Sequence, residues 1–325
     1  MKAVGVDIGG TRIKAGLVDR DGRILRRIAV ETPTDPEEFK RVLATVISDL
    51  ASGDHELAGV GIGCKGIIDY ETTRIEVLPG LLRPLEGTLL SDLVPLEVPV
   101  RADNDAKVAL AGELLWGAAQ GRRNVVLLTL GTGVGGAVVA EGRFLRGVGG
   151  VAGHLGHYTL DPDGPVCICG NHGCLEAYFS ADAIEAEAFR AVHSGCVSVL
   201  TDRFKQQPER IRCRDVFEAA AEGDELARLI RDRATRRLAA AIAGLLHIFD
   251  PEIVILGGQI VDAGAALLEP LERDVEWRTR GLLRRKVPLV VQQIEDRSGI
   301  AGAAALVFGG SWGQDAQSPI PARAS

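Results

Sequence analysis

Residues 4–18 read VGVDIGGTRIKAGLV, with an apolar run on either side of a Gly-Gly-Thr turn. The second run is too short and too strand-like to be the helix of a dinucleotide-binding motif, and the Gly-Lys-Ser/Thr of a Walker loop is missing. The pattern therefore predicts a strand–glycine turn–strand hairpin, with the acid Asp7 near the end of its first strand. Because glycine lets a backbone approach a ligand closely, the N–H groups of this turn are expected to face a phosphate, although a plain hairpin turn would show the same pattern.

The same design returns further along, where residues 125–139 read VVLLTLGTGVGGAVV. Two similar hairpins, one in each half, indicate a duplicated domain with a nucleotide between the halves, which is the arrangement of the actin-like ATPase (sugar kinase/Hsp70) fold. A third glycine pair, Gly257-Gly258, ends the apolar run 253–256. It either lies under the adenine or ribose of the nucleotide or ends a strand in a tight turn. The predicted fold class is thus α/β, with two domains that each hold a mixed sheet flanked by helices.

A different signal lies in the segment His154–Glu176, HLGHYTLDPDGPVCICGNHGCLE. It contains a Cys3His set of the kind that binds zinc, made of His157, Cys167, Cys169 and Cys174. Turn-forming residues at 163–165 and 170–173 would bend the chain so that these ligands converge. Three thiolates and one imidazole fill a tetrahedral site and leave no position for water, which predicts a structural zinc. Three buried cysteines and a core histidine are the alternative.

The composition is that of a soluble globular protein. A chain of 325 residues exceeds one ordinary hydrophobic core, so two domains are expected. The net charge of −7 argues against nonspecific binding to nucleic acid or anionic membranes, and no segment is long and apolar enough to span a bilayer. Six cysteines, three of them in the predicted zinc set, favour a reducing, cytoplasmic location over a disulfide framework. Cys64, Cys196 and Cys213 receive no role.

Apolar residues with a period of 3.6 predict helices over residues 36–51, 105–115 and 224–249, and residues 57–63 are predicted to form a strand. The helix 224–249 is expected to bury Leu226, Leu229, Ile230, Leu238, Ile242, Leu245 and Leu246. Its opposite side is expected to be solvated and carries Arg228, Arg231, Asp232, Arg236 and Arg237. The small, apolar residues 298–308 predict a closely packed helix that crosses back to the first domain.

These elements predict a small domain over residues 1–117, rejoined by the C-terminal helix 298–310. A large domain is predicted over residues 118–297, with a zinc-bearing insertion at 154–176. Residues 311–325 are polar and contain proline, so they are predicted to form a disordered tail.

Five motifs in sequence order resemble those of the ROK family, and the resemblance runs from Val4 to Phe308. The motifs are Asp7–Thr11, Asn104-Asp105-Ala106 with Gly112-Glu113, Leu130–Gly136, Gly156-His157 and Cys167–Glu176. The family contains bacterial glucokinases, N-acetylhexosamine kinases, fructokinases and related repressors. Its kinases transfer a phosphoryl group from ATP and magnesium to a sugar hydroxyl, so the resemblance implies ATP and a hexose or hexose derivative as partners.

The resemblance also implies roles for individual residues. Asp105 matches the catalytic base and Asn104 a ligand of a sugar hydroxyl, although an acid at a helix start can be only a cap. Asp7 is expected to help hold magnesium. The implied sugar ligands are Gly66, Asn104, Asp105, His154, His157 and Glu176. The implied ATP ligands are Gly5, Val6, Asp7, Ile8, Gly9, Gly10, Thr11, Arg12, Gly131, Thr132, Gly133, Val134, Gly135, Gly136, Gly257 and Gly258. His157 is expected to bind zinc through one ring nitrogen and to turn the other toward the sugar.

Three positions depart from the family pattern. His154 stands where glutamate is usual, Lys107 where asparagine is common, and Cys64-Lys65-Gly66 replaces the usual proline-glycine. The change at His154 affects a sugar ligand and leaves the identity of the sugar open. A glucokinase-like reaction at O6 of a hexose is expected first, and a kinase for an N-acetylhexosamine or fructose is the alternative.

Other classes of protein are disfavoured. A ROK repressor would carry a helix-turn-helix arm ahead of the first strand, and the residues before Val4 are too few for one. A non-catalytic sugar sensor on the same fold would be expected to lack the catalytic acid, and Asp105 is present. A dehydrogenase would need a glycine motif that opens a helix. Because family members are often dimers or tetramers, a homodimer or homotetramer is expected, without a nucleic-acid or membrane partner.

Overall fold

The computed structural model describes residues 1–54, 56–294 and 299–309. The chain forms two compact units. Unit 1 consists of residues 1–125, 137–153 and the described residues from 292 onward. Unit 2 consists of residues 126–136 and 154–291. The predicted tail 311–325, and positions 298 and 310 of the predicted C-terminal helix, lie outside the described residues.

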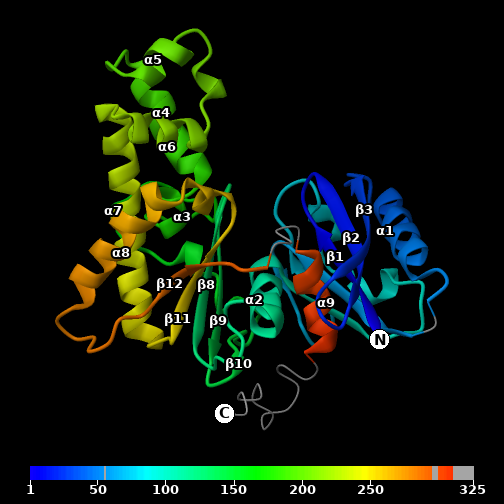
Figure 1. Ribbon diagram of the computed structural model, residues 1–325. Helices are drawn as coiled ribbons and strands as arrows, with labels where there is room; N and C mark the ends of the chain where they lie inside the picture. Colours follow the sequence, from blue (N-terminus) through cyan, green and yellow to red (C-terminus); the bar gives the residue numbers. More distant parts are fainter. Residues whose placement is uncertain (55, 295–298, 310–325) are drawn as a thin grey trace. The chain divides into compact units, whose positions relative to one another are not determined.

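Unit 1 is built on a five-stranded mixed sheet (Figure 1). Its strands are β1 (Lys2–Ile8), β2 (Arg12–Asp19), β3 (Ile24–Glu31), β4 (Leu57–Cys64) and β7 (Val100–Asn104), in the order β3-β2-β1-β4-β7. Strands β1, β2 and β3 pair antiparallel, which confirms the predicted first hairpin. Strands β1, β4 and β7 run parallel, so their carboxyl ends meet at one edge of the sheet.

Helix α1 (Pro36–Ala51) covers one face of this sheet and confirms the predicted helix. Asp35 caps it by accepting a hydrogen bond from the backbone N–H of Glu38, and Pro36 occupies the first turn, where a missing N–H costs nothing. Its apolar stripe packs on alternate residues of β1; the stripe is Phe39, Leu43, Val46, Ile47 and Leu50. The other elements are α2 (Asp105–Trp116), β5 (Ile67–Ile68), β6 (Ile75–Val77) and the 3₁₀ turns η1 (Arg83–Leu85) and η2 (Leu90–Leu93).

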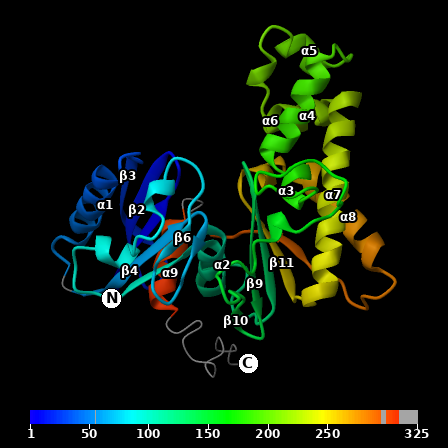
Figure 2. The same cartoon turned by 180° about the vertical axis from the view of Figure 1, so that it is seen from behind.

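Helix α9 (Ile300–Phe308) lies against the opposite face, beside α2 (Figure 2). A Cβ atom added to Gly5 would lie 2.0 Å from the carbonyl oxygen of Ile300, and one added to Gly61 would lie 1.8 Å from that of Ala303. The helix therefore rests directly on the backbones of β1 and β4. This close approach explains why α9 consists largely of alanine and glycine, as its predicted close packing requires.

A second five-stranded sheet has the order β10-β9-β8-β11-β12. Its strands are β8 (Val125–Leu130), β9 (Val134–Ala140), β10 (Arg143–Phe144), β11 (Ile253–Gly257) and β12 (Leu289–Val291). Strands β8 and β9 are neighbours joined by residues 131–133, which confirms the second predicted hairpin. Strand β11 is buried throughout and ends at Gly257.

The helices of unit 2 are α3 (Leu175–Tyr178), α4 (Ala181–His193), α5 (Val199–Phe204), α6 (Cys213–Glu222), α7 (Glu225–Phe249) and α8 (Ala265–Thr279), with 3₁₀ turns η3 (Leu155–His157), η4 (Pro208–Arg210) and η5 (Gln259–Ala263). The long helix α7 packs against α3, α4, α6 and α8, and only α7 among these was predicted (Figure 1). Within the described part of the chain, no helix has the length and apolar character that crossing a membrane requires.

Helix α7 follows most of the predicted pattern, but Leu226 is only half-buried and Arg231, predicted on the solvated side, is 17% exposed. Asp224 caps the helix, and the residues buried as predicted are Ile230, Leu238, Ile242, Leu245 and Leu246. The predicted burial of Leu229 is wrong, because its side chain is 43% exposed. Helical spacing places Leu229 on one face with the exposed residues Arg233 and Arg236, whereas the small residues Ala227 and Ala234 complete the buried stripe.

Candidate functional site

Several predicted site segments open from one edge of the unit 1 sheet. Strand pairing places Ile8 of β1, Cys64 of β4 and Asn104 of β7 next to one another, so the residues that follow them emerge side by side. In open α/β sheets, this carboxyl edge is where ligands bind. The segments that share the edge are the glycine turn 9–11, Lys65-Gly66 and Asp105.

The first glycine turn is fixed by hydrogen bonds at both ends. The N–H of Gly9 donates to the carbonyl oxygen of Arg12 at 3.0 Å, and the hydroxyl of Thr32 donates to that of Gly9 at 2.8 Å. Of the predicted ATP ligands here, three are exposed: Gly10, Thr11 and Arg12. Asp7 and Gly9 are half-buried, whereas Gly5, Val6 and Ile8 are buried within β1. The accessible part of this predicted set is therefore the turn itself together with Asp7.

Asn104 and Asp105 have different environments at the start of α2. Asn104, only 6% exposed, caps the helix by accepting from the N–H of Ala106 at 3.0 Å, and its amide donates to the carbonyl oxygen of Gly66 at 2.9 Å. Asp105 accepts from the same N–H of Ala106 at 2.9 Å, and its residue is exposed. Because Asn104 supplies the cap, the carboxylate of Asp105 stays accessible beside the positive end of the helix dipole.

A buried cluster of charges lies directly beneath these two residues and was not predicted. Asp103 is 1% exposed; its Oδ2 accepts a hydrogen bond from Nε of Arg146 at 3.0 Å and forms an ion pair with Nη2 at 2.9 Å. The guanidinium of Arg146 also lies 3.8 Å from the centre of the Tyr70 ring. Lys107, likewise 1% exposed, donates through Nζ to the carbonyl oxygen of Gly150 at 2.7 Å.

The two cations and the carboxylate of this cluster compensate one another. Burial raises the pKa of Asp103, and the charges of Arg146 and Lys107 oppose that rise. Burial lowers the pKa of Lys107, and the charge of Asp103 opposes that fall. The cluster ties the first turn of α2 to the segment 146–150. The only sequence signal was a lysine inside a helix that is apolar on nearly all sides.

Glu113, which contributes to the sequence resemblance, has a structural role. It is 2% exposed, and its Oε1 accepts from the N–H groups of Gln293 and Ile294 at 2.9 Å each. Its Oε2 accepts from the N–H of Ala118 at 2.7 Å. Glu113 thus fastens the chain that leads toward α9 to the end of α2.

In unit 2, Glu176 supports the second glycine turn. The turn closes with a bond of 3.0 Å from the N–H of Gly131 to the carbonyl oxygen of Gly133. Oε2 of Glu176 accepts from the N–H of Val134 at 2.9 Å, and a Cβ atom added to Gly133 would lie 2.4 Å from that oxygen. The predicted sugar ligand Glu176 is therefore also part of the predicted ATP turn.

The third predicted glycine pair lies beside the same turn. Gly258 has a φ of +87°, and a Cβ atom added to it would lie 2.3 Å from the carbonyl oxygen of Leu130, the last residue of β8. Gly257 is buried at the end of β11. Gly258 is thus needed for close packing on β8, whatever else it contacts.

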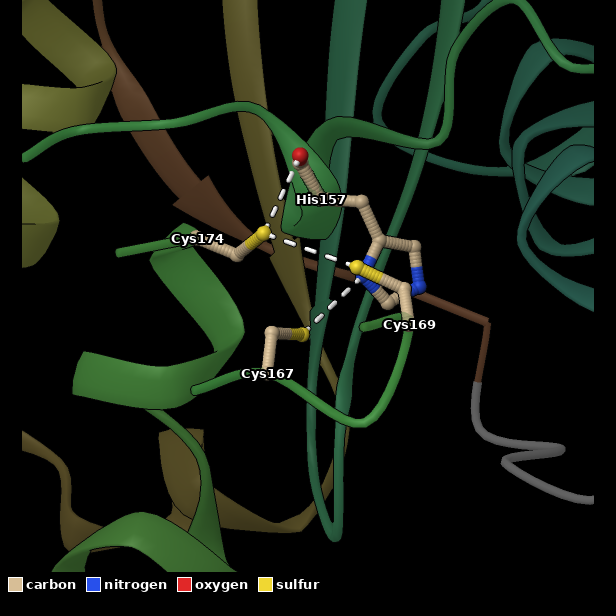
Figure 3. A group of neighbouring side chains, drawn as sticks. All are labelled: His157, Cys167, Cys169 and Cys174. Carbon is tan, nitrogen blue, oxygen red and sulfur yellow. Dashed lines mark hydrogen bonds between the residues drawn. The ribbon is translucent and has the colours of Figure 1, made fainter. Parts of the chain in front are cut away.

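The four predicted zinc ligands come together in unit 2 (Figure 3). One ligand atom from each of the four lies within 4.8 Å of the others. The sulfurs of Cys169 and Cys174 are 3.7 Å apart, and the sulfur of Cys167 is 3.5 Å from Nδ1 of His157. Tetrahedral zinc with Zn–S bonds of about 2.3 Å places two sulfurs about 3.7 Å apart, so the spacing fits this metal.

The orientation of His157 agrees with the predicted division of its ring nitrogens. Nδ1 faces the sulfurs, and Nε2 points away from them (Figure 3). Burial raises the pKa of the Cys174 thiol to about 12, whereas the backbone N–H of Asn171 lowers the pKa of exposed Cys169. A divalent cation would stabilise all three thiolates against that burial. His154 is half-buried and directly precedes the 3₁₀ turn η3, which ends at His157.

Comparison with known proteins agrees with this arrangement. The model of the ROK family matches residues 3–309. The chain is 38% identical over 313 residues to a glucokinase from Thermotoga maritima, covering 94% of this chain and 97% of that one. It is 33% identical over 323 residues to an N-acetylmannosamine kinase from Escherichia fergusonii, covering 95% and 99%.

Among solved structures, a ROK family glucokinase from Streptomyces griseus in complex with glucose and AMPPNP matches with a TM-score of 0.78 and 33% identity, covering 94% of this chain and 99% of that one. The predicted α/β architecture of the actin-like ATPase fold is thereby confirmed. With the two glycine hairpins, the Asn-Asp pair and the converging Cys3His set all in place, the chain belongs to the ROK family.

Proposed function

We propose that this protein transfers the terminal phosphoryl group of ATP to O6 of a hexose, with Asp105 as general base. That it is an ATP-dependent sugar kinase follows from its family and its glucokinase relatives. The sugar, the hydroxyl and the base are the proposed parts. The observation that carries them is the exposed carboxylate of Asp105 at the first turn of α2, on the same sheet edge as the glycine turn 9–11.

In the proposed reaction, Asp105 takes the proton of the sugar hydroxyl as its oxygen bonds to phosphorus. Asn104 holds the start of α2 in place, and an amide has a second N–H and a second lone pair, which we assign to a sugar hydroxyl. Gly66 contributes by fixing Asn104 through its carbonyl oxygen. Half-buried Asp7 is assigned to magnesium, directly or through water; bound magnesium would neutralise charge on the phosphates.

We assign the phosphates of ATP to the two glycine turns, 9–12 and 131–136. Both turns contain glycines, whose lack of a side chain lets the backbone approach an anion. The first turn is held by the hydrogen bond from Thr32 to Gly9, and the second by the hydrogen bond from Val134 to Glu176. Gly257 and Gly258, at the end of β11, are assigned to the nucleoside.

We assign a structural zinc to His157 and the three cysteines, because their donor chemistry and spacing fit it. Such an ion would hold the ring of His157 so that Nε2 is available to a sugar hydroxyl. It would also fix the segment that ends at Glu176, whose Oε2 already binds the N–H of Val134. The other oxygen, Oε1, which lies 3.8 Å from the sulfur of Cys167, is assigned to the sugar.

The sugar itself depends on His154. Glutamate, the usual family residue, only accepts hydrogen bonds, whereas neutral histidine offers one donor and one acceptor. An N-acetyl or keto group supplies an acceptor for an imidazole N–H. The known relatives include both glucokinases and N-acetylmannosamine kinases, so both classes of sugar belong in the test.

The test is ADP release with glucose, mannose, fructose, N-acetylglucosamine and N-acetylmannosamine, with and without magnesium. We expect magnesium-dependent turnover of at least one of these sugars, and a product that phosphorus NMR identifies as the 6-phosphate. Turnover of none of them would overturn the hexose kinase proposal, and a phosphate at another carbon would overturn the choice of O6. Three predictions stay untested: a homodimer or homotetramer, a cytoplasmic location, and the domain limits. Light scattering would measure the oligomeric state.

A further inference from the structure

Lys65 follows β4 at the carboxyl edge of the unit 1 sheet, and its backbone is fixed on both sides. Cys64 before it pairs with Ile8 and Asn104 of the neighbouring strands. Gly66 after it binds the Asn104 amide through its carbonyl oxygen and has a φ of +92°. The side chain of Lys65 therefore starts from a rigid point between the glycine turn and Asp105.

The ammonium group of Lys65 lies over the glycine turn. A Cβ atom added to Gly10 would lie 3.4 Å from Lys65 Nζ, and one added to Gly80 would lie 3.5 Å from it. The residue as a whole is half-buried rather than extended into solvent. A positive charge thus stands beside exposed backbone that is itself suited to an anion.

Across the residues that the structure describes, the Lys65 ammonium forms neither a hydrogen bond nor an ion pair. The charges at this edge affect the pKa of the buried Cys64 thiol. Burial raises this pKa, the charges of Asp105 and Asp7 raise it further, and the charge of Lys65 lowers it. A half-buried cation between two carboxylates and a glycine turn is complementary to a group with several negative oxygens.

We propose that Lys65 Nζ binds the oxygens of the phosphoryl group while that group is transferred, which makes Lys65 a second catalytic residue of this chain. The inference rests on the proposed function. The bond between phosphorus and the leaving oxygen of ADP breaks, the bond to the sugar oxygen forms, and Asp105 takes the hydroxyl proton. Lys65 keeps its proton throughout and stabilises only the charge on the transferred group.

The test compares Lys65→Met, which removes the charge, with Lys65→Arg, which keeps it. Lys40→Met is the matched control, because it removes a lysine of α1 whose ion pair is with Glu37 of the same helix. We expect Lys65→Met to lower kcat by about 10²-fold, the size typical of losing one preorganised donor to a developing charge. Lys65→Arg should retain more of kcat, and Lys40→Met should match the wild type.

A binding measurement separates this role from a structural one. Affinity for MgADP with aluminium fluoride and sugar, which mimics the phosphoryl group in flight, should fall with kcat in Lys65→Met, while affinities for MgADP alone and for sugar alone stay unchanged. An unchanged kcat, or a loss confined to the KM of the sugar, would overturn the proposal. If Lys65→Met does not fold, the same measurements are made on Lys65→Gln, with the same expected results. A wild type that phosphorylates no hexose would instead refute the proposed function.

Discussion

Replacing Arg146 by methionine would remove one cation from the buried cluster beneath Asp105. The guanidinium donates one hydrogen bond to Asp103 from Nε at 3.0 Å, forms an ion pair with it through Nη2 at 2.9 Å, and lies 3.8 Å from the centre of the Tyr70 ring. Methionine keeps a long unbranched stem, so the change removes the charge and the hydrogen bond while much of the packing is retained.

The expected loss in the free energy of unfolding follows from these contacts. Hydrogen bonds to a charged group contribute about 1.5–3 kcal/mol, and stacking of the guanidinium on Tyr70 adds about 0.5–2 kcal/mol. Breaking a buried ion pair costs about 3–5 kcal/mol when the remaining charge has no other partner. Lys107 still faces Asp103, so the lower end of that range applies. We expect the free energy of unfolding to fall by about 3 kcal/mol near neutral pH.

The loss of stability caused by Arg146→Met should decrease as the pH falls. The pKa of Asp103 already lies above its usual value because of burial, and removal of Arg146 raises it further. Below that raised pKa, the folded variant holds a proton that the unfolded chain has lost, so the variant gains stability as the pH falls. The deficit relative to the wild type should therefore be larger at about pH 7 than at about pH 5.

Urea unfolding followed by circular dichroism at both pH values measures this deficit. Arg83→Met is the control, because Arg83 is 80% exposed and its ion pair with Glu86 is 3.9 Å long; it should cost less than about 0.5 kcal/mol. A deficit for Arg146→Met below about 1 kcal/mol, or one of equal size at both pH values, would refute the view that Arg146 compensates Asp103.

Four further changes probe the site. Asp105→Ala should lower kcat by about 10²–10⁴-fold while sugar and ATP still bind; retention of half the wild-type kcat would rule Asp105 out as the base. Protein purified without chelators should carry one zinc per chain, and stripping it should disorder residues 154–176 and weaken sugar binding more than ATP binding; metal analysis that finds no zinc contradicts this. Gly133→Val should displace the Glu176 carboxylate and weaken ATP binding by about tenfold or more, and unchanged ATP affinity would mean that the hairpin is only a turn. His154→Glu should change the rank order of kcat/KM among hexoses and N-acetylhexosamines, and an unchanged order would show that His154 does not contact the sugar.

Features set by local sequence were predictable. The two hairpins, helix α1 and the Cys3His set each depend on residues that are close in the chain, and each is where the sequence placed it. Helix α7 was predictable in extent, but its Leu229 was assigned to the wrong face because a leucine was preferred to the neighbouring alanines as a core residue. Helices α4, α5, α6 and α8 were missed, although α4 and α6 each bury one apolar face and this pattern was present in the sequence.

Features set by tertiary contact were not predictable. The charges of Asp103 and Arg146 compensate each other across 43 residues of sequence, and Glu113 binds backbone 180 residues away. The contact of Glu176 with Val134 likewise joins the zinc-bearing segment to the glycine turn. Lys65 could be noticed as a departure from the family pattern, but only the fold shows that its ammonium lies over Gly10.

The packing of α9 on bare strand backbone has a consequence for how the chain folds in the cell. Gly5 of β1 and Gly61 of β4 have no side chains with which to bury that face, and among the described residues the backbone of α9 covers them. Yet residues 300–308 leave the ribosome long after β1, β4 and β7 have been made. At about 5–20 residues per second, the sheet of unit 1 waits roughly 10–40 s between the synthesis of β7 and the arrival of its cover. Because unit 1 includes α9, it completes its packing only after residue 308 has been made, and not as an N-terminal domain early in synthesis.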